Sequence, residues 1–477
     1  MTGRRGTRLV VLGAGPGGYT AAFLAADRGL NVTLIDPAPD PGGVCLYRGC
    51  IPSKALLHVA AVLQEAREAA AWGITFPAPR IDLDRLRAWK ERVVGQLTGG
   101  LGQLREKRNV RAIRGRARFR SASSVWIDQG DAGTETVEFD HAIIATGSEP
   151  LPLPLLPRDP ERIMDSTAAL ELRDIPGQLL VIGGGYIGLE LGSVYAALGS
   201  RVSVVEMTPS LLPGVDPDLV RPLARRLDQR FESVRLETRI VAAEAVEGGI
   251  HLTLEQAGGE RAGQTFDKVL VAVGRRPSAD DLGLENTRVE VDPAGFIRVD
   301  AQRRTDEPSV FAIGDVAGQP MLAHKAAHEA RAAVEALAGQ PAVFEPRAIP
   351  AVVFTDPEIA WCGLTSTAAA AAGREVEVAR FPWAASGRAA TLGRSDGLTK
   401  LVVDPASERI LGVGLTGPGA GELIAAGVLA VEMGARVSDL RLTIHPHPTL
   451  SETLMEAADA YFGESTHVYR PRRRPDR

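Results

Sequence analysis

This 477-residue chain has few cysteines, few long apolar runs and no excess of positive charge. Cysteine occurs only as Cys45, Cys50 and Cys362, which excludes a secreted fold built on disulfides. Residues 9–26 carry no charge, but clustered glycines interrupt them, and no other segment approaches the roughly 20 apolar residues of a membrane span. The net charge of −5 gives no reason to expect binding to nucleic acid or an anionic membrane. We therefore expect a soluble, cytoplasmic protein with no membrane insertion and no nucleic-acid partner.

Lysine is the other scarce residue. Of the 54 basic residues, six are lysine and the rest are arginine. Because this chain uses arginine where either residue would serve, the retained lysines are candidates for places that need a compact ammonium group. They are Lys54, Lys90, Lys107, Lys268, Lys325 and Lys400.

Two copies of one supersecondary unit form the main internal pattern. Residues 8–36 have the pattern of a β-rich strand, a Gly-rich turn, an Ala-rich helix and a second strand. Residues 178–206 repeat this order, with their first glycine 170 residues after that of the first copy. The length allows three or four domains. The duplication therefore predicts an α/β protein with two Rossmann-like dinucleotide-binding domains.

The segments around these units complete the expected pattern. Residues 53–108 are predicted to be helical, and residues 141–148 and 267–277 have the pattern of buried strands ending in small residues. Residues 296–300 and 310–316 are expected to be further strands. From about residue 347, strand-like and helical segments alternate without the Gly-rich turn, which indicates a separate C-terminal α+β domain.

The turn of the first unit has the features of a pyrophosphate site. Gly13, Gly15, Gly17 and Gly18 lie between strand and helix, where glycine permits a tight turn and close approach of backbone amides to a phosphate. Asp36 follows Gly13 by 23 residues, where a carboxylate can accept a hydrogen bond from a ribose hydroxyl. The alternative is a structural turn followed by a surface acid.

The second unit repeats this spacing with a different acid. Gly183, Gly185 and Gly188 form its turn, and Glu206 follows Gly183 by the same 23 residues. A carboxylate here suits the free 2′-hydroxyl of NAD and repels the 2′-phosphate of NADP. The two residues after Glu206 are uncharged, whereas an NADP site usually has arginine near this point. We therefore predict a preference for NAD.

Cys45 and Cys50 form a close pair in the segment GGVCLYRGCIPSK, residues 42–54. Five residues of regular helix rise about 7.5 Å, whereas the Cα atoms of a disulfide usually lie within about 7 Å. The segment must therefore bend, and Gly49 can supply the bend. Zinc is the alternative, but no clustered Cys or His ligands follow nearby. Lys54, one turn after Cys50, is either a cation that favours a thiolate or a surface lysine.

The cysteine pair also bears on which nucleotides bind. Two nucleotide sites can hold two NAD molecules, or one FAD and one NAD. NAD does not readily accept electrons directly from a dithiol, whereas a flavin does. The pair therefore favours FAD together with NAD.

A histidine–glutamate constellation lies near the C-terminus, in IHPHPTLSETLMEAA. A thiol–disulfide enzyme needs a base that ionises the incoming dithiol, and histidine suits neutral pH. A carboxylate can orient the imidazole. Spacing favours His447, which Glu452 follows, over His445, and a structural histidine is the alternative.

Segments spread from residue 9 to about residue 460 carry a family resemblance. They are VLGAGPGGYTAA, GGVCLYRGCIPSKALLH, AIIATGS, GGGYIGLE, VEM, VGRRP, FAIGDV, MLAHKAAHE, TDPEIAW, FPWAASGRA and HPTLSE. Together they resemble the pyridine nucleotide-disulfide oxidoreductases. FPWAASGRA with HPTLSE resembles the lipoyl-acting branch, the dihydrolipoyl dehydrogenases, rather than the glutathione reductases.

The resemblance implies oxidation of a dihydrolipoyl group on a lipoyl-bearing protein, with reduction of NAD. It implies a redox disulfide between Cys45 and Cys50, Lys54 paired with Glu190, and a cis bond between His447 and Pro448. It also implies a homodimer, because the family's His–Glu pair, here His447 and Glu452, acts on the disulfide of the partner subunit.

The resemblance further implies the nucleotide contacts. For FAD it indicates the first Gly-rich turn and Asp36, Lys54, Gly115, Thr146, Gly147, Ser148, Gly314, Asp315, Met321, Leu322, Ala323 and His324. For NAD it indicates Gly183, Gly185, Tyr186, Ile187, Gly188, Glu190, Glu206 and Gly274.

We expect five segments along the chain. An FAD-binding domain spans residues 1–150, and an NAD-binding domain spans residues 151–277. A central domain, residues 278–346, completes the FAD site. The dimerisation domain spans residues 347–468, and the basic, Pro-broken tail, residues 469–477, is expected to be disordered.

Two departures from the family pattern bear on substrate and redox poise. The family more often has Asn-Val where this chain has Tyr47 and Arg48, and it commonly has Ala in place of Pro446. We hypothesise that Arg48 stabilises the thiolate form.

Rival functions are a mercuric reductase, a glutathione-type reductase and a non-catalytic flavoprotein that acts as a scaffold or NADH sensor. A mercuric reductase would need extra C-terminal cysteines, and beyond Cys50 only Cys362 exists, whereas Glu206 argues against the glutathione-type reductase.

Overall fold

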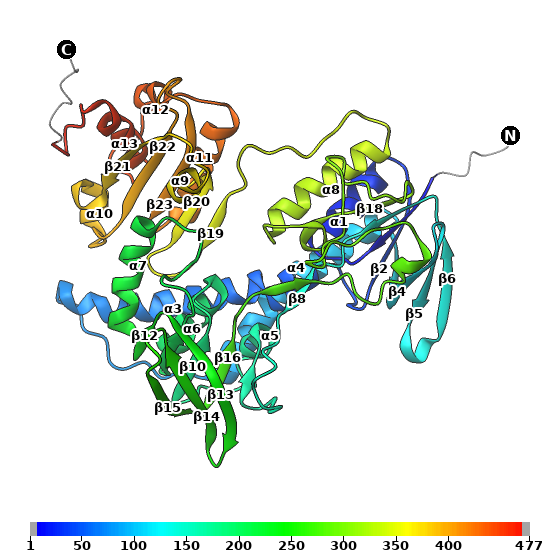
Figure 1. Ribbon diagram of the computed structural model, residues 1–477, viewed down its shortest axis with the longest axis horizontal. Helices are drawn as coiled ribbons and strands as arrows, with labels where there is room; N and C mark the ends of the chain where they lie inside the picture. The colour runs from blue at the N-terminus through cyan, green and yellow to red at the C-terminus, as the bar shows by residue number, and fades with distance from the viewer. Residues whose placement is uncertain (1–6, 470–477) are drawn as a thin grey trace.

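The first parallel sheet draws its strands from distant parts of the chain (Figure 1). The computed structural model describes residues 7–469. Its first sheet has the order β18-β7-β1-β2-β3. These strands are β1 (Arg8–Leu12), β2 (Asn31–Asp36), β3 (Arg111–Arg114), β7 (His141–Ile144) and β18 (Val310–Ala312). The chain therefore returns to complete this sheet after building the second one.

Helices cover the first sheet with alanine-rich faces. α1 (Pro16–Asp27) begins with proline, whose fixed φ suits the first helical position. It packs against α8 (Ala323–Leu337), and buried alanines on both helices permit close approach. α2 (Gly43–Arg48), α3 (Cys50–Glu68) and α4 (Leu83–Lys107) follow β2 in sequence.

The second parallel sheet has the order β12-β11-β10-β16-β9. Its central strands β10 (Gln178–Ile182) and β11 (Arg201–Val205) flank α6 (Tyr186–Leu198) in sequence, as β1 and β2 flank α1. The other members are β9 (Ile163–Met164), β12 (Ser233–Arg235) and β16 (Lys268–Val271). The predicted duplication is therefore confirmed as two parallel sheets with the same strand–turn–helix–strand unit.

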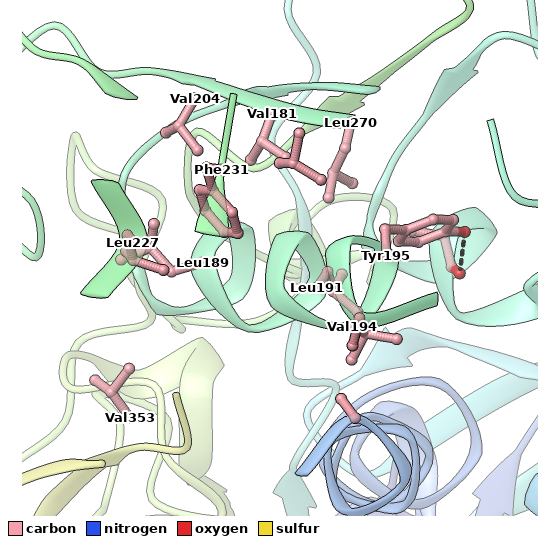
Figure 2. Close-up of a cluster of buried hydrophobic side chains, with 14 of the residues drawn as sticks. Val181, Leu189, Leu191, Val194, Tyr195, Val204, Leu227, Phe231, Leu270 and Val353 are labelled. Carbon is pink, nitrogen blue, oxygen red and sulfur yellow. Dashed lines mark hydrogen bonds between the residues drawn. The ribbon is translucent and has the colours of Figure 1, made fainter. Parts of the chain in front are cut away.

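The core beneath the second sheet joins the two nucleotide units. Val181 and Leu270 point from the strands toward α6, and Leu189 of α6 lies beside Leu227 of α7 (Figure 2). The same buried cluster includes Leu56 and Ala60 of α3. α3 therefore belongs to the first unit in sequence and packs on α6 of the second unit.

Smaller antiparallel elements join the parallel sheets. β4 (Arg116–Ser121), β5 (Ser124–Asp128) and β6 (Thr134–Glu138) form one meander, and β13 (Thr238–Val246), β14 (Gly249–Gln256) and β15 (Arg261–Phe266) form another. β8 (Ser148–Pro150) pairs with β17 (Arg275–Pro277) where the chain leaves the first unit and returns. α5 (Ser166–Glu171) and α7 (Pro217–Arg230) belong to the second unit.

The C-terminal part contains an antiparallel sheet in the order β19-β20-β23-β22-β21. Its strands are β19 (Ala351–Val353), β20 (Ile359–Gly363), β21 (Glu377–Pro382), β22 (Leu398–Val403) and β23 (Ile410–Thr416). The accompanying helices are α9 (Ser366–Ala371), α10 (Gly387–Thr391), α11 (Ala420–Glu432), α12 (Val437–Leu442) and α13 (Glu452–Phe462). The predicted α+β character of this part is confirmed.

One predicted strand is wrong. Residues 296–300 form only an isolated bridge, between Ile297 and Val291, within the described part of the chain. Asp292 Oδ1 accepts hydrogen bonds from two nearby backbone N–H groups, and Asp300 Oδ1 does the same on the other side. These side-chain turns take backbone donors that a longer ladder would need.

The limits of the predicted domains stay a prediction. Residues 278–346 contribute β18 and α8 to the first unit, so this segment adds to an existing sheet. Residues 470–477 of the predicted tail lie outside the described residues. Among residues 7–469, no helix is long and apolar enough to cross a membrane.

Candidate active site

The bend predicted between the two cysteines is present. α2 ends at Arg48 and α3 begins at Cys50, with Gly49 between them at φ −147° and ψ −115°. A Cβ atom at Gly49 would lie 2.8 Å from the carbonyl oxygen of Val44, so only glycine allows this close return of the chain. The break brings the thiols of Cys45 and Cys50, both free in the structure, within hydrogen-bonding reach.

The two thiols have different acidities. The hydrogen bond from Cys45 lowers the pKa of Cys50, burial opposes this, and Lys54 lowers it further, to about 7. The same thiol–thiolate contact, together with burial, raises the pKa of Cys45 well above its usual range. The directions of the two shifts therefore favour the thiolate at Cys50 over the thiolate at Cys45.

A buried ion pair lies one turn after Cys50. Nζ of Lys54 on α3 lies 2.8 Å from Oε2 of Glu190 on α6, and Glu190 is 2% exposed. Oε1 of Glu190 accepts a hydrogen bond from the backbone N–H of Phe354, at 2.9 Å. The predicted contact between Lys54 and Glu190 is confirmed, and it connects the two nucleotide units beside the thiols.

A cavity of about 1100 Å³ opens beside these groups. This volume lies slightly above the roughly 300–1,000 Å³ typical of ligand and cofactor sites. Cys45, Cys50, Tyr186, Ile187 and Glu190 contribute to its lining. Most residues predicted for FAD also line it, namely Gly13, Gly15, Gly17, Asp36, Lys54, Gly115, Thr146, Gly147, Ser148, Gly314, Asp315, Met321 and Ala323.

Three residues predicted for FAD lie outside this lining: Gly18, Leu322 and His324. A Cβ atom at Gly18 would lie 1.8 Å from the carbonyl oxygen of Gly13, so this glycine permits helix packing. The ring of His324 lies 2.7 Å from the carbonyl oxygen of Pro350. These residues support the walls of the site through their neighbours.

The two carboxylates predicted to bind ribose make equivalent contacts. Asp36 accepts hydrogen bonds from the N–H groups of Ala14, at 2.7 Å, and Ala38, at 2.8 Å. Glu206 accepts corresponding bonds from the N–H groups of Gly184 and Thr208, at 2.7 and 2.8 Å. Each acid thus holds its own Gly-rich turn, and each carboxylate oxygen still has a lone pair for a hydroxyl group.

The other residues predicted for NAD lie in the second turn, directly after β11 or after β16. Gly183, Gly185, Gly188, Glu206 and Gly274 are outside the lining of the large cavity. A Cβ atom at Gly188 would lie 2.4 Å from the carbonyl oxygen of Gly183, which repeats the packing of the first turn. The second turn therefore has the same local geometry as the first.

A buried carboxylate fixes the loop that contains Gly314 and Asp315. Glu329, fully buried on α8, accepts the N–H of Gly314 at 2.6 Å. Its other oxygen lies 3.0 Å from both Lys325 and Arg303. These paired charges hold the loop against the cavity, although none of the three charged residues lines the cavity itself.

His447 and Glu452 form the predicted pair in a separate place. Nδ1 of His447 lies 2.8 Å from Oε1 of Glu452, and Oε2 of Glu452 accepts the N–H of Thr449. Burial raises the pKa of Glu452, but these contacts outweigh it and lower the pKa overall. Nε2 of His445 has no partner among the described residues. The bond between His447 and Pro448 is cis, as expected.

This pair lies far from the thiols within the chain. Neither His447 nor Glu452 lines the large cavity. Glu452 begins α13, which lies in the C-terminal part of Figure 1, well separated from α3. The side chain of His447 is 80% exposed. One chain therefore holds the two halves of the predicted site in different places.

Comparison with known families decides the classification. Residues 7–330 match the family model described as pyridine nucleotide-disulphide oxidoreductase, and residues 349–458 match the dimerisation domain of the same family. The chain belongs to this family. It is 47% identical over 461 residues to the dihydrolipoyl dehydrogenase of Vibrio cholerae, with 97% of each chain covered.

Further relatives come from distant organisms. The chain is 48% identical to the dihydrolipoyl dehydrogenase of Thermus scotoductus, covering 96% of this chain and 98% of the relative. Among solved structures, LpdA from Mycobacterium tuberculosis has a TM-score of 0.87 at 27% identity, covering 95% and 99%. The HOCl-induced flavoprotein disulfide reductase RclA from Escherichia coli has a TM-score of 0.83 at 28% identity, covering 94% and 98%.

Two residues at the site had no role assigned from the sequence. Arg275 lines the cavity and donates from Nε to Oγ of Ser148, at 2.8 Å, while Ser148 donates to Oδ2 of Asp315, at 2.5 Å. Its motif, VGRRP, was visible in the sequence, but its partner was not. Phe354 contacts both Lys54 and Glu190. No sequence signal indicates a contact across 300 residues.

Proposed function

We propose that this chain oxidises a protein-bound dihydrolipoyl group to the lipoyl disulfide and reduces NAD, with FAD as bound cofactor. The observation that carries the proposal is the pair of free thiols, Cys45 and Cys50, beside the Lys54–Glu190 ion pair at a cofactor-sized cavity between two nucleotide-binding units. The relatives named dihydrolipoyl dehydrogenase, which match nearly the full length, support the same activity.

FAD fits the first unit. Glycine-only packing at the first turn, the Asp36 carboxylate and the cavity beside Cys50 suit a dinucleotide with a ring system near the thiols. The loop at Gly314 and Asp315 completes its wall. When bound, FAD supplies a two-electron acceptor between the dithiol and NAD.

NAD fits the second unit by the same argument. Glu206 is 7% exposed and is held by two backbone N–H groups, so its carboxylate cannot easily turn away from a ligand. A 2′-phosphate placed against it would meet like charge. This arrangement supports NAD over NADP.

The roles of Cys45 and Cys50 in the thiol chemistry follow from their different pKa values. His447 removes a proton from one dihydrolipoyl thiol, and the resulting thiolate attacks Sγ of Cys45 in the oxidised Cys45–Cys50 disulfide. The disulfide bond breaks, and Cys50 leaves as a thiolate, which Lys54 stabilises. The second dihydrolipoyl thiol then loses its proton to solvent and attacks the lipoyl sulfur of the mixed disulfide, which closes the lipoyl ring. Cys45 leaves with the electron pair and takes a proton from His447.

A second copy of the chain completes the site. His447 is exposed and distant from the thiols of its own chain, and the C-terminal part matches a dimerisation domain. In the proposed homodimer, His447 and Glu452 of one subunit serve the Cys45–Cys50 pair of the other. A cytoplasmic location is part of the proposal, because free thiols that cycle with a bound cofactor suit a reducing compartment.

Replacement of Cys45 tests the proposal. Cys45→Ser should abolish oxidation of dihydrolipoamide and leave FAD bound, because Cys45 is the sulfur that the substrate attacks. Full turnover by this variant would overturn the scheme. Rates with purified lipoyl domains from 2-oxo acid dehydrogenase complexes, glycine cleavage and sulfur metabolism then identify the preferred partner.

A further inference from the structure

The ion pair beside the thiols has a third participant from the C-terminal part of the chain. Nζ of Lys54 lies 4.6 Å from the centroid of the Phe354 ring. The backbone N–H of the same residue donates to Oε1 of Glu190. Phe354 thus contacts the cation through its ring and the anion through its backbone, at the junction of α3, α6 and the end of β19.

The segment that contains Phe354 is held firmly. Two residues later, Asp356 bonds to Arg226 and Arg230 of α7, and both arginines also contact Glu68 at the far end of α3. Arg394 contacts Asp356 from the C-terminal part. Burial raises the pKa of Asp356, but the three arginines outweigh it and lower the pKa overall. The segment therefore cannot shift without disturbing paired charges.

The half-buried ring also lies close to the start of α11. A Cβ atom at Gly421, in the first turn of α11, would lie 3.6 Å from Cε1 of Phe354. The N–H of Gly421 donates to Oε2 of Glu358, which fixes the start of α11. The Phe354 ring consequently has a defined position between α11 and the ammonium group of Lys54.

We infer that Phe354 is a positioning residue for Lys54: its ring holds the ammonium group where it faces the Cys50 thiolate as well as Glu190. The inference rests on the proposed function of the thiol pair and adds a residue to it. A cation over an aromatic face is attracted by the ring quadrupole, and partial burial strengthens the attraction. Without the ring, Glu190 remains as the ammonium's main partner and can draw it away from the sulfur.

The consequence should appear in the acidity of Cys50. Lys54 favours the Cys50 thiolate and Glu190 disfavours it. Loss of the ring should therefore raise the pKa of Cys50. It should leave the backbone contact between residue 354 and Glu190 in place, because any side chain keeps that N–H group.

The test uses FAD-bound enzyme that carries Cys45→Ser, so that Cys50 is the thiol that titrates near neutral pH. Cys362 does not interfere, because burial raises its pKa to about 12. Thiolate absorbance in the ultraviolet and the long-wavelength charge-transfer absorbance are both followed against pH. Phe354→Leu should move the midpoint upward by about 0.5 pH unit, whereas Phe354→Tyr should keep the original midpoint.

Two controls separate positioning from a general packing effect. Phe344→Leu removes a comparable ring, which lies 5.2 Å from the guanidinium carbon of Arg303, and should leave the Cys50 midpoint unchanged. In a Lys54→Met background, Phe354→Leu should have no further effect on the midpoint. An unchanged midpoint in Phe354→Leu, or a full shift in the Lys54→Met background, would overturn the inference.

This experiment is independent of the proposed reaction. The titration needs neither a lipoyl substrate nor NAD. If dihydrolipoamide is not a substrate but the midpoint responds to Phe354 as described, the proposed function fails and the positioning role stands. If dihydrolipoamide is oxidised but the midpoint does not respond, only the positioning role fails.

Discussion

Nδ1 of His447 lies 2.8 Å from Oε1 of Glu452, yet neither side chain lines the cavity that contains Cys45 and Cys50. The separation predicts that two inactive chains can complement each other. Cys45→Ser and His447→Gln chains, dissociated and reassembled together, form hybrid dimers with one site in which both groups are intact. With equal mixing, half the dimers are hybrids, so activity should recover to roughly a quarter of that of the unmodified enzyme.

The control for this experiment is each variant reassembled with itself, which should stay inactive. A mixture that also stays inactive, although hybrid dimers are detected by mass spectrometry, would place His447 and the cysteines of one chain in the same site.

Lys54, rather than Arg48, should control the Cys50 thiolate. Arg48 is exposed and makes no hydrogen bond or ion pair with the residues between 7 and 469, whereas Lys54 is among the groups that act most strongly on Cys50. The structure therefore favours Lys54 over the initial hypothesis for Arg48. Thiolate titration in the Cys45→Ser background should show an upward shift for Lys54→Met and little change for Arg48→Asn. A large upward shift for Arg48→Asn with little change for Lys54→Met would show instead that Arg48 is the stabilising cation.

The pH dependence follows from the sign of the Cys50 shift. The pKa of Cys50 is lowered to about 7, so the thiolate is present above that pH and is lost as pH falls through it. In the reduced enzyme, charge-transfer absorbance should fall with a midpoint near pH 7. A band that persists unchanged to pH 5 would show that another group controls it.

Nucleotide preference should depend on Glu206. The intact enzyme should use NADH far better than NADPH, measured as kcat/KM. Glu206→Gln removes the charge and keeps an acceptor for a backbone N–H group. The ratio of kcat/KM for NADH to kcat/KM for NADPH should therefore fall by about tenfold or more. Asp36→Gln is the comparison in the equivalent position of the first unit, and it should affect FAD retention without changing the NADH to NADPH ratio.

A buried lysine should contribute strongly to stability. Lys400, 1% exposed on β22, lies 2.8 Å from both Asp216, 2% exposed, and Asp218 near the start of α7. Lys400→Met leaves the buried Asp216 without its cation, whereas Asp218 keeps Arg380, and breaking such a buried pair costs about 3–5 kcal/mol. Denaturant unfolding measures the loss. The exposed Lys107→Met should change the free energy of unfolding by less than about 0.5 kcal/mol.

The same pair predicts the direction of acid sensitivity. Burial raises the pKa of Asp216, but hydrogen bonds from Lys400 and Thr367 outweigh it and place the pKa well below its usual range. The stabilisation is therefore complete above about pH 4, the value for an unfolded aspartate, and declines as pH falls below it. Lys400→Met should flatten this decline. If the stability of Lys400→Met falls with acid pH as it does in the unmodified protein, other carboxylates cause most of the acid sensitivity.

The sequence predicted what depends on local pattern. The two Gly-rich turns, the bend at Gly49 and the places of Asp36 and Glu206 follow from short-range sterics and helix termini, and the structure confirms them. Of the six rare lysines, Lys90, Lys325 and Lys400 are buried, whereas Lys107 is exposed, so scarcity alone does not identify special positions. Residues 296–300 were misjudged as a strand because aspartate side chains on both sides compete for backbone donors.

The contact between Lys54 and Glu190 was predicted only through the family resemblance, and other contacts between distant segments could not be predicted from the pattern of residues. Phe354 meets Lys54 because β19 passes beside α3, and Arg275 meets Ser148 because β17 pairs with β8. The hydrophobic pattern of each segment does not specify its neighbour. The separation in space of His447 from the thiols of its own chain also depends on how the C-terminal sheet packs against the two nucleotide units.

The most direct test of the redox assignment is anaerobic reduction of the FAD-bound enzyme by dihydrolipoamide. The account predicts a long-wavelength charge-transfer band from the Cys50 thiolate, which disappears on addition of NAD as NADH forms in stoichiometric amount. Cys45→Ser should not respond to dihydrolipoamide. Failure of the intact enzyme to be reduced, or reduction of Cys45→Ser at the same rate, would contradict the central role of the Cys45–Cys50 pair.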